Sequence, residues 1–405
     1  MPNLSILLRI LIIFSSVFCG LFGVYFVYTC LFGLFRERAT VPGQRPKTRI
    51  AAVIAARNEA QVIGKLIDSL NAQDYPRSLY DIYVIPNNCT DDTAAVASAA
   101  GARVLDCDVE VRAKGDALRF AFQKLCATGD YDAYCVFDAD NLVSPNFFRC
   151  VNDARLAGFH AAQGFRDSKN PSDNWVSGAM SAFYWFMSRL FNESRARLGM
   201  SCQLNGTGFM VSDALVRRVG WDTHTLTEDL EFTALCALDG TKVGWMPDAR
   251  VYDEQPLKFW VSVVQRRRWT AGSMQCLRRY VGRLLRKHSV ASMDMAALFT
   301  GNLLGVIGLI PGIATVCDVA VRCYEDPMLI PLLLIIGFLY YCGCALGATI
   351  LYRIEGRLTR RSIPGILGFP IFLVSWMPIN LYAIFTPAPR WKEIRHTQNY
   401  DKPGE

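Results

Sequence analysis

The stretch AYCVFDAD, residues 133–140, is a short apolar run that ends on two carboxylates. Its length and apolar content are typical of a buried strand. A helical pattern at 114–126 precedes it, and strand and helix patterns alternate before that. This alternation predicts an α/β domain with a mostly parallel, doubly wound sheet. The earlier strands are predicted at 49–56, 81–86 and 102–106, and the earlier helices at 58–73 and 93–100.

Two aspartates, Asp138 and Asp140, flank one residue at the end of this strand. Sheets of this kind bind ligands beyond the carboxyl ends of their strands, which makes both side chains candidate ligands. Mg²⁺ is typically bound by one or two carboxylates together with phosphate oxygens of a substrate. A second pair, Asp106 and Asp108, also follows a predicted strand. From the residues alone, both pairs stay candidates.

The segment TLTEDLEF, residues 225–232, has a structural and a chemical interpretation. Thr227 before two acids is typical of a helix N-cap followed by carboxylates in the first turn. Alternatively, Glu228 or Asp229 is a general base that takes a proton from an acceptor hydroxyl. The nearby segment QLNGTGFM, residues 203–210, supplies two glycines where backbone can approach a ligand. It lacks the GK[ST] of a phosphate-binding loop, so it indicates no ATP site.

The segment QRRRW, residues 265–269, places three arginines before a long apolar stretch. Such a run is usually a solvated face or a topology signal at a membrane, where tryptophan suits the headgroup region. Arginine also binds phosphate through paired hydrogen bonds, and an indole can stack on a sugar or a base. Both interpretations stay open.

Long apolar stretches predict a membrane protein. Residues 10–35 carry no charge and can span a bilayer, and the cluster of basic residues that follows predicts that the chain enters the cytoplasm there. Three more apolar stretches lie at Met295–Cys317, Met328–Tyr352 and Ile363–Phe385. The last contains prolines and is expected either to cross or to re-enter the membrane. The predicted parts are an anchor at 1–36, a soluble domain at 48–275, an interfacial connection at 276–294, a bundle of two or three spans at 295–386 and a tail at 387–405.

Composition excludes several other classes of protein. Hydrophobic residues make up 52% of the 405 residues, which is high for a soluble protein. The net charge of +7 lies mostly beside apolar segments, which favours phosphate or anionic lipid over nucleic acid as a partner. The 14 cysteines are scattered without a CxxC pair, as expected for reduced thiols, and four histidines make a zinc site unexpected.

The order of these motifs resembles that of the membrane-bound, processive family 2 glycosyltransferases, such as the cellulose, chitin and hyaluronan synthases and poly-N-acetylglucosamine synthase. Over residues 50–270 the shared segments are, in order, AARNEA, NNCTDDT, KGDAL, FDADN, NGTGFM, TED and QRRRW. The resemblance implies a GT-A-like, Rossmann-like α/β domain in the cytoplasm, flanked by transmembrane helices.

The resemblance also implies roles for individual residues. Asp229 of TED would be the catalytic base, while Asp138 and Asp140 would bind the donor diphosphate through Mg²⁺ or Mn²⁺. The family order selects this pair over Asp106 and Asp108. Arg266 and Arg267 occupy positions that vary in the family pattern. The residues implied to bind the nucleotide sugar are Ala55, Arg57, Glu59, Asn87, Lys114, Asp138, Gln265, Arg268 and Trp269.

Two features depart from the family pattern. Asn87 stands where the family usually has an aspartate that reads the base, although an amide oxygen can still accept the imide N–H of uracil. The chain also has fewer predicted membrane helices than cellulose synthase. The expected function is inverting, metal-dependent transfer from a UDP-sugar to a growing polysaccharide or oligosaccharide, with membrane lipid and export proteins as candidate partners. The alternatives are single-sugar transfer to a lipid carrier and a catalytically decayed membrane scaffold.

Overall fold

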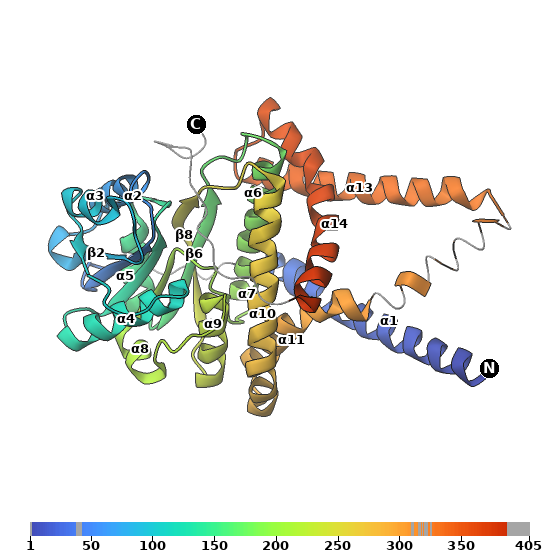
Figure 1. Ribbon diagram of the computed structural model, residues 1–405, viewed down its shortest axis with the longest axis horizontal. Coiled ribbons are helices and arrows are strands. Elements are labelled where there is room, and N and C mark those ends of the chain that lie inside the picture. The colour runs from blue at the N-terminus through green and yellow to red at the C-terminus, as the bar shows by residue number, and fades with distance from the viewer. Residues whose placement is uncertain are drawn as a thin grey trace.

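The computed structural model describes residues 2–37, 43–308, 312–314, 317, 319, 323–324 and 326–386. At its centre is an eight-stranded sheet with the strand order β3-β2-β1-β4-β7-β6-β8-β5 (Figure 1). The predicted tail at 387–405 lies outside the described residues. The strands are β1 Ile50–Ala56, β2 Tyr80–Pro86, β3 Arg103–Val104, β4 Ala133–Asp138, β5 Leu142–Val143, β6 Ala161–Ser168, β7 Phe209–Ser212 and β8 Val243–Asp253.

The pairing of the strands confirms the predicted α/β fold with a mostly parallel sheet. β1 runs parallel to β2 and β4, and β2 runs parallel to β3. β7 is antiparallel to both of its neighbours, β4 and β6. The register aligns Ala55 with Asp138 and Ala56 with Pro86. The carboxyl ends of β1, β2 and β4 therefore meet at one edge of the sheet.

Both faces of the sheet are covered by helices. Ile50, Ala52 and Ile54 of β1 are fully buried with residues of α2, α3 and α5. Ala51 and Val53 point to the other face and pack with α4, α8 and α9. Burial on both faces explains why β1 is apolar without alternation. These helices are α2 Ile63–Asn71, α3 Thr93–Ala99, α4 Lys114–Thr128, α5 Phe147–Leu156, α8 Asp213–Val219 and α9 Glu228–Asp239.

A second layer of helices stands between the sheet and two helices, α1 and α13, that project from the molecule (Figure 1). Three segments of the described chain are long and apolar enough to cross a membrane, at residues 9–31, 329–354 and 360–385. The layer and the projecting helices are α6 Trp175–Phe186, the π-helix η3 Met187–Glu193, α7 Ser194–Arg197, α10 Phe259–Lys287, α11 Val290–Ile307, α14 Ile363–Phe385, α1 Pro2–Leu31 and α13 Leu329–Ile354.

The last apolar helix, α14, packs against α6 and α10 rather than standing free. In Figure 1 it runs transverse to α13 and along α6 and α10. A Cβ added to Gly178 of α6 would lie 2.6 Å from the Cα of Gly365, so the two backbones touch. Pro370 and Pro378 lie inside this helix without ending it. α10 in turn runs unbroken through residue 275, where the sequence predicts a domain boundary.

Buried ion pairs fix the inner end of α13 to the sheet. The Glu355 carboxylate is fully buried and accepts hydrogen bonds from Arg189 of η3 at 2.6 Å and Arg250 of β8 at 3.0 Å. Arg250 also donates to Asp167 at 2.7 Å, and the indole of Trp185 donates to the same carboxylate at 2.7 Å. Moving α13 away would separate these partners and leave buried charges uncompensated. This cost holds the helix in one position.

Candidate active site

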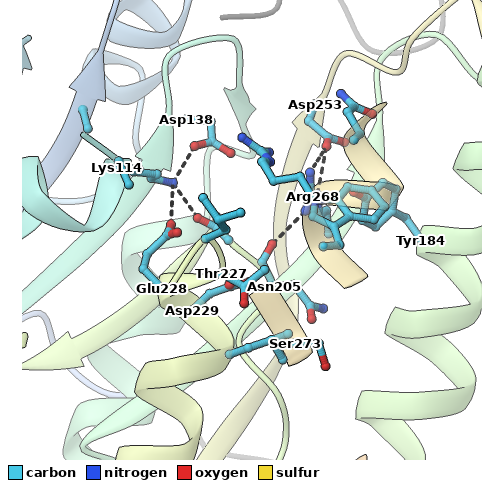
Figure 2. Close-up of a pocket in the computed structure, with 18 of the residues that line it drawn as sticks. Lys114, Asp138, Tyr184, Asn205, Thr227, Glu228, Asp229, Asp253, Arg268 and Ser273 are labelled. Carbon is cyan, nitrogen blue, oxygen red and sulfur yellow. Dashed lines mark hydrogen bonds and ion pairs between the residues drawn. The ribbon is translucent and has the colours of Figure 1, made fainter. Parts of the chain in front are cut away.

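The carboxyl ends of β1, β2 and β4 open into a cavity of about 440 Å³ (Figure 2). Every site residue that the sequence predicts lines this cavity, whereas the exposed Asp106 and Asp108 do not. The structure thus brings distant segments together, while the roles of their residues stay predictions. The predicted residues that line the cavity are Ala55, Arg57, Glu59, Asn87, Lys114, Asp138, Asp140, Asp229, Gln265, Arg268 and Trp269.

Lys114, the first residue of α4, connects three walls of the cavity (Figure 2). Its Nζ lies 2.5 Å from Oδ1 of Asp138 and 2.7 Å from the carbonyl oxygen of Gly206, and 3.8 Å from a carboxylate oxygen of Glu228. Burial opposes ionisation of Asp138, but Lys114, with Arg166 and Arg268, outweighs it and holds the pKa of Asp138 below its usual value. Asp138 is therefore an anion at neutral pH.

The carboxylates at the end of β4 suit a divalent cation that binds together with a phosphate ligand. In the described ranges, no three His, Cys, Asp or Glu side chains converge as a complete metal-binding group. Burial, and then the nearby Asp140, raise the pKa of Asp253 to about 6 against the opposing charge of Arg166. Negative charge is thus concentrated here. Because Mg²⁺ and Mn²⁺ accept one or two carboxylates and complete their shell with water and substrate phosphate, Asp138 and Asp140 fit such an ion.

We expect Asp140→Ala to weaken Mn²⁺-dependent binding of UDP roughly 10- to 100-fold, at least as much as the loss of an outer-shell partner of a metal ligand. Asp108→Ala, at the exposed carboxylate outside the cavity, should bind like the wild type. Titration calorimetry of detergent-purified protein with Mn²⁺ or with EDTA measures both. Equal Mn²⁺ dependence in wild type and Asp140→Ala would contradict the assignment.

Glu228 and Asp229 begin α9 and face the cavity (Figure 2). The predicted cap is incorrect in one respect: the hydroxyl of Thr227 makes no capping hydrogen bond. It packs instead against Gly272 of α10, where an added Cβ would lie 2.5 Å from Oγ1. Burial raises the pKa of Asp229, and burial together with Asp229 raises the pKa of Glu228 to about 7. Carboxylates with raised pKa values are suited to proton transfer near neutral pH.

We expect Glu228→Gln to flatten the pH dependence of stability. The folded-state pKa of about 7 lies above the ordinary 4.5, so the folded protein holds this proton more tightly than the unfolded chain. The resulting stability is complete below about pH 4.5 and is lost as the pH rises through about 7. Glutamine imitates the neutral acid, so the variant should unfold about 2–4 °C higher than wild type at pH 8 but not at pH 5. Thermal unfolding in detergent tests this, and equal shifts at both pH values would contradict it.

The three arginines of QRRRW have separate environments on α10. Arg266 is fully buried and donates to Oγ of Ser375 at 2.7 Å and to the carbonyl of Phe372 at 3.2 Å. Its guanidinium also lies 4.2 Å from the centre of the Phe372 ring. Arg266 is therefore not on a solvated face but is a clamp between α10 and α14. Arg267 donates to the hydroxyl of Thr386 at 3.1 Å.

Arg268 alone of the three lines the cavity, beside Gln265 and Trp269. Among the described residues, Nε of Arg268 and Oε1 of Gln265 are buried without a hydrogen-bond partner. Buried polar atoms normally have partners, and a guanidinium matches the geometry of phosphate oxygens. The Nε–H of Arg268 is available to donate to an anionic ligand, and Oε1 of Gln265 is available to a hydroxyl or N–H donor.

The glycines of NGTGFM differ in function. Gly206 has a φ of 81°, and its carbonyl accepts the hydrogen bond from Lys114 at the cavity. A Cβ added to it would lie 3.6 Å from Oδ2 of Asp229. Gly208, with a φ of 63°, does not line the cavity. A Cβ added to it would collide with Val251. Only Gly206 brings backbone close to a ligand site.

Arg166 of β6 is a central residue of the site that the sequence interpretation missed. Its guanidinium donates to Oδ2 of Asp253 at 2.8 and 2.5 Å and to the carbonyl of Asn205 at 2.7 Å, and lies 4.0 Å from the centre of the Tyr184 ring. It holds positive charge between the carboxylates and the aromatic wall. The other side of the cavity is apolar and aromatic, and includes Phe183, Met187, Phe191, Leu298, Phe299 and Trp376.

Comparison with known proteins agrees with this architecture. The family described as "Glycosyltransferase like family 2" matches residues 46–272. A beta-monoglucosyldiacylglycerol synthase of Synechocystis is 28% identical over 364 residues, which cover 86% of this chain and 74% of that protein. A protein of the same name from Nostoc is 27% identical over 56% of this chain, which spans about half of that relative, 49%.

A solved structure shares the fold across nearly the whole chain. It is a mannosyltransferase from Pyrobaculum calidifontis in complex with GDP-Man and Mn²⁺, with a TM-score of 0.63 and 17% identity. The similarity covers 93% of this chain and 99% of that one. The family match over more than half of the chain, together with the fold, establishes that this protein belongs to the glycosyltransferase-like family 2 and is a glycosyltransferase with a GT-A-like domain.

Proposed function

We propose that the protein transfers a single sugar from a nucleotide-activated donor to the hydroxyl of a membrane lipid, with inversion at the sugar carbon. The observation that carries this proposal is the two-sided cavity, charged at the strand ends and apolar where the helices close it. The similarity to a protein named beta-monoglucosyldiacylglycerol synthase, over 86% of the chain, supports it. Transfer to a lipid, the alternative interpretation of the sequence, is therefore favoured over polymer synthesis.

The ends of β1 and β2 would hold the nucleotide. Nδ2 of Asn87 donates to the carbonyls of Ala56 at 2.9 Å and Ile85 at 3.3 Å, which leaves Oδ1 as the free acceptor side of the amide. An acceptor suits a base with a ring N–H, such as the imide N–H of uracil. With the family resemblance, this supports a UDP-sugar. The neighbouring residues assigned to the nucleotide are Ala55, Arg57 and Glu59.

The middle of the cavity would bind the diphosphate. Asp138 and Asp140 would hold Mg²⁺ or Mn²⁺, which when bound supplies positive charge to the departing diphosphate. Arg268 would donate paired hydrogen bonds to a phosphate, with Gln265 beside it. Lys114 would add a second cation that its contacts with Asp138 and Gly206 hold in place. Fixed charges of this kind stabilise a leaving group without reorganisation.

Asp229 would be the base. The acceptor oxygen forms a bond to the anomeric carbon while the bond from that carbon to the diphosphate oxygen breaks. The electron pair leaves with the diphosphate, and the hydroxyl proton passes to the carboxylate of Asp229. Attack opposite the leaving group inverts the anomeric carbon. The raised pKa of Asp229, caused by burial, strengthens it as a proton acceptor.

We also propose that α1 and α13 cross the membrane and that residues 48–275 lie on the cytoplasmic side. Both helices are apolar, and the most apolar window of each is almost entirely exposed. Their ends nearest the sheet carry Arg36 and Arg353, and more arginines follow α13, as the positive-inside rule expects of a cytoplasmic end. α14, packed along α6 and α10, would lie at the membrane surface with the basic end of α10 and the connection at 276–294.

The proposal is tested with full-length protein in detergent, Mg²⁺ or Mn²⁺, and each of UDP-glucose, UDP-N-acetylglucosamine, UDP-glucuronate and GDP-mannose. We expect release of the nucleoside diphosphate from one UDP-sugar to be stimulated by diacylglycerol. Stimulation by oligosaccharides but not by lipid would contradict the proposal. No release with any donor would favour the decayed scaffold.

A further inference from the structure

We infer that the apolar end of the cavity, between η3 and α11, holds an acyl chain of the acceptor, and that the indole N–H of Trp376 binds an ester carbonyl of the same lipid. This inference rests on the proposed transfer to a lipid. It adds the place where the lipid binds and the lipid chemistry that the site recognises.

The apolar end is built from long aliphatic and aromatic side chains. Met187 and Phe191 come from η3, and Leu298 and Phe299 come from α11. A diphosphate would gain nothing from such a wall, because its oxygens need hydrogen-bonding partners. An acyl chain gains about 0.8 kcal/mol for each buried CH₂ group. η3 is a π-helix, a form that is frequent at functional sites, and this agrees with a ligand at this wall.

The same wall lies against a candidate membrane span. Ser194, which directly follows η3, donates to the carbonyl of Cys30 in α1 at 2.8 Å. A Cβ added to Gly301 of α11 would lie 3.9 Å from the ring of Phe26 in α1. The Tyr25 hydroxyl of α1 donates to Asp294 of α11. Because both elements of the wall contact α1, the apolar end of the cavity lies beside a candidate membrane span, the side from which a lipid would come.

Trp376 of α14 stands at the junction of the apolar and polar sides. Its ring lies 5.5 Å from that of Phe183 and 6.2 Å from that of Trp269, which is on the motif that carries Arg268. Its Nε1 is buried and has no hydrogen-bond acceptor among the described residues. A buried indole N–H normally has a partner. In a glycerolipid, an ester carbonyl lies close to the free hydroxyl that receives the sugar. Such a carbonyl is a suitable acceptor for the N–H of Trp376, because Trp376 lies between the acyl site and the polar side of the cavity.

The first test fills part of the apolar end of the cavity with a larger side chain. We expect Leu298→Trp to raise KM for a long-chain diacylglycerol about 10- to 100-fold, the range that overpacking of an apolar site produces. The KM for the UDP-sugar should rise less than the KM for the lipid, because the nucleotide binds at the strand ends. Val290→Trp is the matched control on the same helix, because Val290 is 76% exposed. Thermal unfolding and UDP binding verify that both variants fold.

The second test removes the indole N–H together with part of the ring, and an ether-linked lipid controls for the lost volume. Trp376→Phe keeps an aromatic ring and should raise KM for an ester-linked diacylglycerol about 2- to 10-fold, the net effect of one hydrogen bond. The matching ether-linked lipid has no carbonyl, so wild type and variant should use it equally well. A structural role for Trp376 would affect both lipids alike, and that result would overturn the assignment.

The outcomes separate the inference from the function on which it rests. If wild type makes a glycolipid and Leu298→Trp has an unchanged KM for the long-chain acceptor, the acyl site is wrong while the proposed function stands. If wild type makes no glycolipid from any lipid, both are overturned. A diacylglycerol with a photoreactive acyl chain should label residues of η3 and α11 in the wild type, and labelling confined to other helices would overturn the inference even if Leu298→Trp fails to fold.

Discussion

Replacing Asp229 by asparagine should lower turnover at least about a hundredfold while UDP binding stays close to wild type, because a general base contributes about 10²–10⁴-fold. Asparagine keeps the size of the side chain and its place at the start of α9. It removes only the proton acceptor that faces the cavity. Single-turnover UDP release with saturating donor and lipid measures the loss, and calorimetry measures the binding.

Asp239→Asn is the matched control for this prediction. Asp239 ends the same helix, where its carboxylate pairs with Arg218 at 2.8 Å away from the cavity. The control should turn over like the wild type. If Asp229→Asn lost UDP binding as strongly as turnover, Asp229 would hold the site together rather than take the proton. If it kept wild-type turnover, the base would have to be a different residue.

Arg268→Lys should also lower turnover, by about a hundredfold, which is the scale of losing one preorganised contact to developing charge. Lysine keeps the charge but loses the planar fork that can grip a diphosphate. Arg266→Lys should act differently. It loses the hydrogen bonds to Ser375 and Phe372 across α14, so its unfolding temperature should fall while the folded fraction keeps its turnover. Arg267→Lys should be mild.

Membrane insertion, thermal unfolding and UDP release of these three variants distinguish the roles. A purely topological role for the run predicts that all three are silent, because either cation orients a membrane protein equally well. Wild-type turnover in Arg268→Lys would exclude the phosphate contact. An unfolding temperature of Arg266→Lys equal to that of the wild type would exclude the role of Arg266 as a clamp between α10 and α14.

The first half of the sheet could be predicted because its residues are decided by local pattern. β1 and β4 are apolar runs, β2 is apolar apart from Asp81, and the carboxylates of Asp138 and Asp140 mark where β4 ends. β6 could not be found in this way. Its sequence AAQGFRDS alternates poorly, because Gln163 and Asp167 are buried in hydrogen-bond networks rather than placed on a solvent face. Arg166 was missed with its strand.

The buried arginine shows a second limit of sequence interpretation. A run of three cations is usually exposed, and nothing within QRRRW distinguishes Arg266 from Arg268. The aromatic and hydroxyl groups that bury Arg266 come from Phe372 and Ser375, more than a hundred residues later. The motif order predicted Arg268 at the cavity, but the environments of the two arginines before it depend on tertiary contacts. Trp376 was missed for the same reason.

The number of sugars per acceptor tests the central claim most directly. The reaction would contain full-length protein, UDP-sugar in large excess, Mn²⁺ and diacylglycerol, and would run to completion. The masses of the extracted products would be measured by mass spectrometry. Single transfer to a lipid predicts one product, the diacylglycerol mass plus one sugar residue, which does not lengthen with time or donor excess. A ladder of products that grows by further sugars, or a lipid-free polymer, would contradict the account.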